Sequence, residues 1–255
     1  MKINFLEKPK KSLGQNFLID NNIIKKIVEL GKIDNNSSII EIGAGYGSLT
    51  ELILNKKPKK LIIIEKDIKL FKFLKKKFKK FKNVKILNKD ILEIVKNKIS
   101  NENIIVYGNL PYNISTKILS SLILLKKWPP WYHTLVLMFQ KEVADRIIAE
   151  ANTKNYGRLT ILSNWRLEVK KHFDVSNNCF FPKPKVYSTV LSFTPIKKKY
   201  FKLRNPRNLE KITHLFFSKR RKMINKTVKK IFKTNNYIVD NLNINLKQRP
   251  GELKK

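Results

Sequence analysis

The sequence predicts an α/β fold in which helices cover both faces of a parallel sheet, followed by a small all-helical domain. Short apolar runs alternate with helical patterns up to about residue 194. Strands that are apolar throughout are typical of parallel sheets buried on both sides. Beyond residue 194 the chain has a Pro- and Lys-rich stretch and then helical patterns only. We therefore expect a first domain over residues 1–196 and a second over residues 197–255.

Seven segments are the expected strands of the sheet. The parallel strands are expected at SSIIEIG (37–43), LIIIE (61–65), VKIL (84–87), NIIVYG (103–108) and TLVLMF (134–139). Two further segments, RLEVKKHF (166–173) and VYSTVLSF (186–193), alternate between apolar and polar residues. This alternation predicts antiparallel strands that close one edge of the sheet.

One helical pattern between the strands spans residues 68–81. Its apolar residues recur at spacings of three and four, which predicts an amphipathic helix with lysines on the opposite side. The apolar face is expected to consist of Ile68, Phe71, Leu74, Phe78 and Phe81.

The composition excludes several classes of protein. The only cysteine is Cys179, which excludes an intrachain disulfide and a multi-cysteine metal site. The three histidines lack the spacing of metal ligands, and no apolar run reaches the ~18 residues of a membrane span. We therefore expect a cytoplasmic protein without a metal ion or a membrane-spanning helix. We also expect it to act as a monomer.

The net charge of +36, from 55 Lys and Arg against 19 Asp and Glu, predicts a polyanionic partner such as nucleic acid. Biased composition is the alternative explanation, because the chain is also rich in Ile and Asn. Residues 197–255 alone contain 19 basic and 3 acidic residues.

A helix expected over residues 217–233 concentrates part of this charge. On a helical wheel its lysines, Lys219, Lys222, Lys226, Lys229, Lys230 and Lys233, fall within an arc of about 100°. Apolar residues such as Ile224 and Val228 occupy another side. A one-sided basic stripe favours RNA binding, whereas a solvated charged face is the simpler alternative. The residues predicted to bind RNA are Lys219, Arg221, Lys222, Lys226 and Lys229.

A glycine-rich turn, EIGAGYG (41–47), ends the first expected strand. Gly43 and Gly45 let the main chain turn sharply and let a ligand approach closely. A dinucleotide-binding motif would need a third glycine at position 48, where this chain has Ser48. The turn therefore does not favour a pyrophosphate ligand.

Acidic residues follow the next two strands. Glu65 is placed to accept hydrogen bonds from both hydroxyls of a ribose, and Asp90 suits the amino group of adenine. The carboxyl ends of parallel strands meet at one edge of the sheet, where open α/β sheets bind ligands. We predict S-adenosylmethionine as the cofactor, because it joins adenosine to a cationic methionine and carries no phosphate.

The tetrapeptide NLPY (109–112) follows the fourth strand at the same edge. The amino group of adenine is a poor nucleophile because its lone pair is delocalised into the ring. The side-chain oxygen of Asn109 and the main-chain carbonyl of Leu110 can accept its two N–H groups and make the lone pair more available. Pro111 restricts the main chain, and Tyr112 offers a ring on which the base can stack.

Several motifs in this order resemble the rRNA adenine N6,N6-dimethyltransferases, specifically the small-subunit enzymes associated with kasugamycin sensitivity. The resemblance implies a Rossmann-like S-adenosylmethionine-dependent methyltransferase domain and a small C-terminal all-helical domain. The motifs are KKSLGQNFLID (10–20), EIGAGYGSLT (41–50), NLPYNIST (109–116), LMFQKEVADRI (137–147), YGRLTILS (156–163) and FFPKPKVYS (180–188).

The resemblance also implies roles for individual residues. Phe180 would be the second aromatic residue that holds the target base, because the family pattern F-x-P-x-P-x-V-x-S aligns with Phe180 rather than with Phe181. Asn109 would contact both cofactor and target. The other cofactor contacts implied are Asn16, Leu18, Gly43, Gly45, Glu65 and Asp90.

The implied reaction is dimethylation of two adjacent adenosines in a hairpin near the 3′ end of small-subunit (16S) rRNA, within an immature ribosomal subunit. The sister enzymes that dimethylate one adenosine of large-subunit rRNA are the nearest alternative. A catalytically inactive RNA-binding assembly factor is another, and so is DNA adenine methylation, although such enzymes usually have proline where this chain has Leu110.

Overall fold

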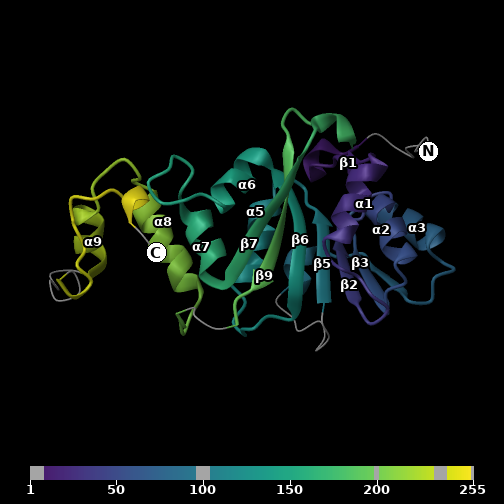
Figure 1. Ribbon diagram of the computed structural model, residues 1–255, viewed down its shortest axis with the longest axis horizontal. Helices are drawn as coiled ribbons and strands as arrows, with labels where there is room; N and C mark the ends of the chain where they lie inside the picture. Colours follow the sequence, from purple (N-terminus) through teal and green to yellow (C-terminus); the bar gives the residue numbers. More distant parts are fainter. Residues whose placement is uncertain (1–8, 96–103, 198–200, 233–239, 254–255) are drawn as a thin grey trace.

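A seven-stranded sheet runs through the centre of the protein (Figure 1). The structure, a computed structural model, describes residues 9–95, 104–197, 201–232 and 240–253. The first five strands in spatial order are parallel and the last two are antiparallel, which confirms the expected sheet. The order is β4 (Val84–Leu87), β3 (Lys60–Ile64), β2 (Ser38–Ile42), β5 (Ile104–Asn109), β6 (Tyr132–Gln140), β9 (Ser188–Pro195) and β7 (Leu167–Val175).

Helices cover both faces of this sheet. In β5, Ile104 and Val106 pack into one apolar cluster, whereas Ile105 and Tyr107 pack into the other. The strands are apolar throughout because successive side chains enter opposite cores. Helices α4 (Ile91–Ile94), α5 (Ser115–Ile123), α6 (Lys141–Ile147) and α7 (Arg158–Arg166) cover the first cluster, and α1 (Asn21–Glu29), α2 (Ser48–Asn55) and α3 (Ile68–Lys77) cover the second.

A separate two-stranded antiparallel sheet joins the N-terminal segment to a distant part of the chain. Strand β1 (Phe17–Leu18) pairs with β8 (Phe180–Phe181). The short 3₁₀ helices η1 (Lys11–Leu13) and η2 (Asn177–Cys179) precede these two strands. No local pattern in the sequence predicted this pairing, because each strand has only two residues.

The helix expected over residues 68–81 is shorter and faces the core differently. It ends at Lys77, and Phe78 already leaves the helical conformation. Leu70, Leu74 and Phe78 form the buried row, whereas Ile68 and Phe81 are exposed. The expected face was therefore wrong at both ends. The chain reverses after the helix to begin β4 at Val84, which leaves Phe81 outside the helix.

Beyond the sheet, the chain forms helices α8 (Arg207–Phe217), α9 (Asn225–Phe232) and η3 (Pro250–Glu252). The Trp165 side chain of α7 donates a hydrogen bond to the Phe201 carbonyl (2.9 Å) and connects this part to the first one. None of the helices in the described ranges is long and apolar enough to cross a lipid bilayer. The boundary between residues 196 and 197 stays a prediction.

The single helix expected over residues 217–233 is wrong. The chain leaves α8 after Phe217 and starts α9 only at Asn225. Tertiary contacts stabilise a non-helical conformation of the intervening segment. The Ile224 N–H donates to the Gln248 carbonyl (2.9 Å), and the Arg220 guanidinium donates to the Thr153 carbonyl (3.0 Å). Lys219 and Lys222 therefore lie in a turn rather than on a shared helical stripe with Lys226, Lys229 and Lys230, and Lys233 lies outside the described residues.

The apolar strand β2 contains one buried carboxyl group, that of Glu41, which is 2% exposed. The Thr50 hydroxyl donates to Oε2 of Glu41 at 2.6 Å. Burial is the main cause that raises the pKa of Glu41 to about 7. The Thr50 hydrogen bond opposes this increase. Of the nearby charges, Glu65 raises the pKa and Lys77 lowers it. A carboxyl group in this state is protonated more readily in the folded chain than in the unfolded one.

We expect this group to make stability pH-dependent. Its pKa is raised by folding, so its contribution is fully present below about pH 4.5 and is lost as the pH rises to about 7. The loss is about 3 kcal/mol of the free energy of unfolding. Glu41→Gln, compared with the wild type by urea unfolding between pH 4.5 and 8, removes this dependence.

Glu29→Gln, on the exposed face of α1, is the matched control. Parallel curves of unfolding free energy against pH for the wild type and Glu41→Gln would rule out the proposed linkage.

Candidate functional site

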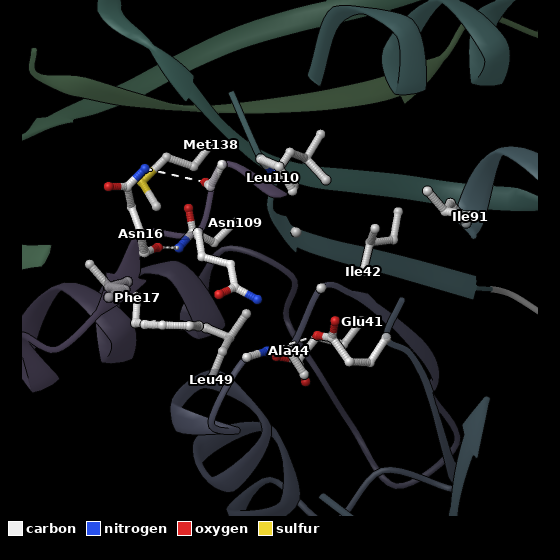
Figure 2. A pocket seen from close by; sticks show the side chains of 18 of the residues that line it. Asn16, Phe17, Glu41, Ile42, Ala44, Leu49, Ile91, Asn109, Leu110 and Met138 are labelled. Atoms are coloured by element: carbon white, nitrogen blue, oxygen red, sulfur yellow. Dashed lines mark hydrogen bonds between the residues drawn. The ribbon is translucent and has the colours of Figure 1, made fainter. Parts of the chain in front are cut away.

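A cavity opens at the carboxyl ends of β2, β3 and β5 (Figure 2). In Figure 2, Asn16 and Asn109 lie together on one side of the cavity, whereas Glu41, Ala44 and Leu49 lie on another. All the residues predicted to bind the cofactor line this one cavity, and so does the NLPY tetrapeptide: Asn16, Leu18, Gly43, Gly45, Glu65, Asp90, Asn109, Leu110, Pro111 and Tyr112.

The glycine turn leaves open space in the cavity wall. Gly43 has φ +70°, and a Cβ atom built on it would meet no atom of the described residues within 4 Å. Gly45 has φ +59°, and its Cβ would lie 2.8 Å from the Phe17 ring. A ligand can therefore approach the main chain of Gly43 closely. At Gly45 the absence of a side chain instead lets the Phe17 ring pack against the turn.

The Glu65 carboxylate is held by main-chain N–H groups on both oxygens. Gly45 N–H donates to Oε2 (3.2 Å) and Asp67 N–H donates to Oε1 (2.9 Å). Burial raises the pKa of Glu65, and these hydrogen bonds partly counter the increase. Each oxygen keeps a further acceptor position, so an oriented carboxylate of this kind can receive two hydroxyl groups from a ribose.

Asp90 follows β4 and caps the N-terminus of α4. Its Oδ1 accepts the Leu92 N–H (2.9 Å), and Lys66 Nζ lies 3.0 Å from Oδ2. Burial acts to raise the pKa of Asp90, but the Leu92 hydrogen bond and the Lys66 charge bring it below its usual value. The group therefore stays an ionised acceptor. In the described part of the chain, no cluster of His, Cys, Asp and Glu side chains is arranged to hold a metal ion.

The Asn109 side chain is oriented by the N-terminal segment. Its Nδ2 donates to the main-chain carbonyl of Asn16 at 3.0 Å (Figure 2). Because the amide nitrogen is used in this bond, the amide oxygen remains as the acceptor of this side chain. The N-terminal segment is itself fastened at Asp67, to which Lys10 Nζ (2.7 Å) and Gln15 Nε2 (3.2 Å) are bound.

Tyr112 is held in place by a residue 76 positions later in the sequence. Its hydroxyl forms a 2.7 Å hydrogen bond with Ser188, which is fully buried at the start of β9. Burial raises the pKa of Tyr112 despite the lowering effect of this hydrogen bond, so the hydroxyl stays protonated. The bond holds the ring at the cavity wall, and no sequence signal other than the F-x-P-x-P-x-V-x-S pattern pointed to Ser188.

Phe180, to which the resemblance assigns the second aromatic contact with the base, is buried next to the cavity, and its role stays a prediction. Its side chain is 3% exposed and packs in the apolar cluster with Leu18 and Met138, and it is not among the residues that line the cavity. Pairing of β8 with β1 places Phe180 opposite Leu18, which explains its burial. In this structure the Phe180 ring therefore supports the cavity wall from behind and does not offer a free face to a base.

Four of the five residues predicted to bind RNA line a second concavity, formed by the turn between α8 and α9, the start of α9 and the segment 247–252. Lys219, Arg221, Lys222 and Lys226 line it, whereas Lys229 on α9 does not. Three basic residues that the sequence analysis did not select also line it, as does the acidic Glu252; they are Arg220, Lys247 and Arg249. The arrangement is a basic surface formed by tertiary contacts instead of by one helix.

Other residues that shape the cofactor cavity were also missed. Asn88 Nδ2 donates to the Glu65 carbonyl (2.9 Å) and the Lys66 carbonyl (3.1 Å), which fixes the main chain after β3. Phe17 packs edge-on against Tyr46 at 4.8 Å between ring centroids. These contacts join residues far apart in the sequence, and hydrophobic periodicity carries no signal for them.

Known proteins resemble this chain over nearly its whole length. The model of the family described as ribosomal RNA adenine dimethylase matches residues 6–253. The chain is 52% identical over 247 residues to the ribosomal RNA small subunit methyltransferase A of Pelagibacter ubique (strain HTCC1062), covering 97% of this chain and 93% of that protein. It is 41% identical to the protein of the same name from Wolbachia pipientis subsp. Culex pipiens (strain wPip), with 98% and 93% covered.

Solved structures agree with the fold. A dimethyladenosine transferase from Plasmodium falciparum superposes with a TM-score of 0.74 at 26% identity, covering 93% of each chain. The 23S rRNA methyltransferase ErmE superposes with a TM-score of 0.67 at 22% identity, covering 93% of this chain and 94% of that one, and confirms the Rossmann-like methyltransferase fold alone. The extent and identity of these matches show that the chain belongs to the ribosomal RNA adenine dimethylase family of S-adenosylmethionine-dependent methyltransferases.

Proposed function

We propose that this enzyme dimethylates N6 of two adjacent adenosines in a hairpin near the 3′ end of small-subunit rRNA. The observation that carries this proposal is the orientation of Asn109, whose amide nitrogen is bound by Asn16 and whose oxygen is left as an acceptor in the cavity. The 52% and 41% identical relatives, both named small-subunit methyltransferases, support this choice over large-subunit rRNA.

The cavity suits S-adenosylmethionine, which when bound supplies a methyl group activated by a sulfonium ion. Glu65, with both oxygens oriented by main-chain N–H groups, would hold the ribose. Asp90, whose lowered pKa keeps it ionised, would accept from the adenine amino group. The open space at Gly43 admits the ligand, and Asn16 and Leu18 would cover its methionine end.

Asn109 and Leu110 would prepare the target amino group. In the first transfer the Asn109 oxygen and the Leu110 carbonyl would accept its two N–H groups, and in the second transfer one of them would accept the single N–H that remains. These hydrogen bonds favour a pyramidal nitrogen with an available lone pair. Pro111 restricts the turn that presents the Leu110 carbonyl, and Tyr112, held by Ser188, would stack on the base. The amine loses its proton after it has reacted, so the site needs no strong base.

We further propose that the enzyme is a cytoplasmic monomer that acts on an immature subunit, with residues 197–255 as its RNA-binding domain. Helix α9 lies at the opposite end of the molecule from β1 of the N-terminal segment (Figure 1). The basic concavity is lined by α9 and the turn before it, and the cofactor cavity by the N-terminal segment. An RNA that reaches both must be long or part of a large assembly, which favours a ribosomal subunit over an isolated hairpin.

Asn109→Ala should lower methyl transfer about 100-fold or more, because it removes an acceptor aimed at the reacting group. Binding of the RNA should stay near the wild-type value. The measurement is transfer of label from S-adenosylmethionine to small subunits that lack these methyl groups, with the modified adenosines mapped afterwards.

The matched control is Asn55→Ala, which removes an exposed amide at the end of α2, away from the residues that line the cavity. Transfer by Asn109→Ala within about threefold of the control would exclude the acceptor role. Label found only in large subunits, or in neither subunit, would contradict the proposed substrate.

Ser188→Ala and Tyr112→Phe should lower transfer by similar amounts, roughly tenfold, since each breaks the same hydrogen bond. The double variant should be no worse than either single one, because the two side chains act as a pair. Affinity for S-adenosylmethionine, measured by calorimetry, should not change. Additive losses in the double variant would show that Ser188 does not act through Tyr112.

Replacing Lys222, Lys226 and Lys229 together by alanine should weaken RNA binding. It should also reduce the slope of log K against log salt, because that slope scales with the number of phosphate contacts. Because only the first two of these lysines line the concavity, restoring Lys229 should recover little of the slope. The control replaces Lys76, Lys79 and Lys80, near the end of α3. An unchanged slope in the first variant would identify these lysines as a solvated surface.

A further inference from the structure

A loop at residues 181–187, here called the rim loop, has an unusual set of exposed side chains. Phe181 is 41% exposed and Tyr187 is 53% exposed. Lys183 and Lys185 are exposed between them, and the loop contains no acidic residue. Exposed aromatic residues clustered in one short segment indicate an interaction surface. The function described above uses none of these four side chains.

Both ends of the rim loop are fixed to the wall of the cofactor cavity. Phe181 pairs with Phe17, which lines the cavity. At the other end Ser188, the residue after the loop, is bonded to Tyr112, which also lines the cavity. The rim loop therefore borders the site where the target base is proposed to enter.

Internal contacts hold the rim loop in place. Asn177 Nδ2 donates to the carbonyl of Pro184, which is buried, at 3.3 Å. The N–H of Lys141 donates to the Tyr187 carbonyl at 2.9 Å. A loop fixed in this way presents its exposed rings without first having to be ordered, which lowers the entropic cost of binding.

Four of the six exposed residues of the rim loop occupy the four variable positions of the F-x-P-x-P-x-V-x-S pattern; Pro182 and Val186, at pattern positions, are exposed as well. Phe180, Pro184 and Ser188, at pattern positions, are buried and support the wall. Phe181, Lys183, Lys185 and Tyr187, at the variable positions, are exposed. Phe180, Pro184 and Ser188 thus anchor the loop, and this chain fills the variable positions with two lysines flanked by two aromatic residues.

We propose that the rim loop binds the nucleotides that flank the target adenosines, with bases stacked on Phe181 and Tyr187 and phosphates held by Lys183 and Lys185. Aromatic rings combined with cations are the means by which proteins bind single-stranded nucleic acid. The charge of the loop favours RNA over a protein surface. This inference rests on the proposed function, because it places the target adenosine in the adjoining cavity.

The first test measures KM for small subunits that lack the methyl groups. Phe181→Ala and Tyr187→Ala should each raise KM at least about fivefold, the lower limit expected for loss of one stacked base. Tyr187→Phe, which keeps the ring, should restore the wild-type KM. The Kd for S-adenosylmethionine should be the same in all variants. Phe81→Ala, an exposed ring in the loop before β4, is the matched control.

The second test reads stacking and phosphate contacts directly, without turnover. A hairpin RNA with 2-aminopurine next to the target adenosines should lose fluorescence on binding to the wild type and to Tyr187→Phe, but less to Phe181→Ala and Tyr187→Ala. Replacing Lys183 and Lys185 by alanine should reduce the slope of log K against log salt by about 1.4, since each single-strand phosphate contributes about 0.7. Replacing Lys79 and Lys80 is the control.

The outcomes separate this inference from the proposed function. Wild-type KM and wild-type quenching in both alanine variants would overturn the role of the rim loop while the methyltransferase activity stands. If the wild type transfers no label to small subunits, the proposed function fails, and the fluorescence measurement still decides whether the rim loop stacks on RNA.

Discussion

The parallel alignment of β2, β3, β4 and β5 is the constraint on which the site depends. It directs the carboxyl ends of these strands to one edge, so that residues from 43 to 112 of the chain surround one cavity. The hydrogen-bond ladder continues into the loops: Gly43 N–H donates to the Ile64 carbonyl, and Glu65 N–H donates to the Leu87 carbonyl, both near 3 Å. The sheet thereby fixes the main chain of the site itself.

Asp67 connects three parts of the site that the sheet alone does not join. Its carboxylate caps α3 through the Lys69 N–H and binds Lys10 and Gln15 of the N-terminal segment, while its own N–H orients Glu65. Burial acts to raise the pKa of Asp67, but its cationic and N–H partners keep it low, so the group stays charged. The segment that orients Asn109 therefore depends on an acid that touches neither Asn109 nor the target.

The acidic residues of the cavity and the basic residues of the surface have separate tasks. Glu41, Glu65 and Asp90 lie inside or at the mouth of the cavity, where they can meet a cationic cofactor. The basic residues dominate the concavity between α8 and α9. The acidic groups are thus placed to serve the cofactor, whereas the basic concavity is placed to attract the RNA backbone.

Sequence alone determined the parallel strands, the glycine turn, the two acids after β3 and β4, and the NLPY tetrapeptide at one sheet edge. These features are local: a strand buried on both faces must be apolar, and a motif keeps its spacing wherever the chain folds. The residues predicted to bind the cofactor consequently line one cavity.

Only the tertiary structure decided which side chains face that cavity. The pairing of β1 with β8 buried Phe180 and exposed Phe181, and a bond across 76 residues attached Tyr112 to Ser188. Contacts of Ile224 and Arg220 with distant carbonyl groups broke the helix that periodicity predicted over residues 217–233. Periodicity reports the preference of a segment for one face of a helix or strand, whereas these outcomes depend on partners that are remote in the sequence.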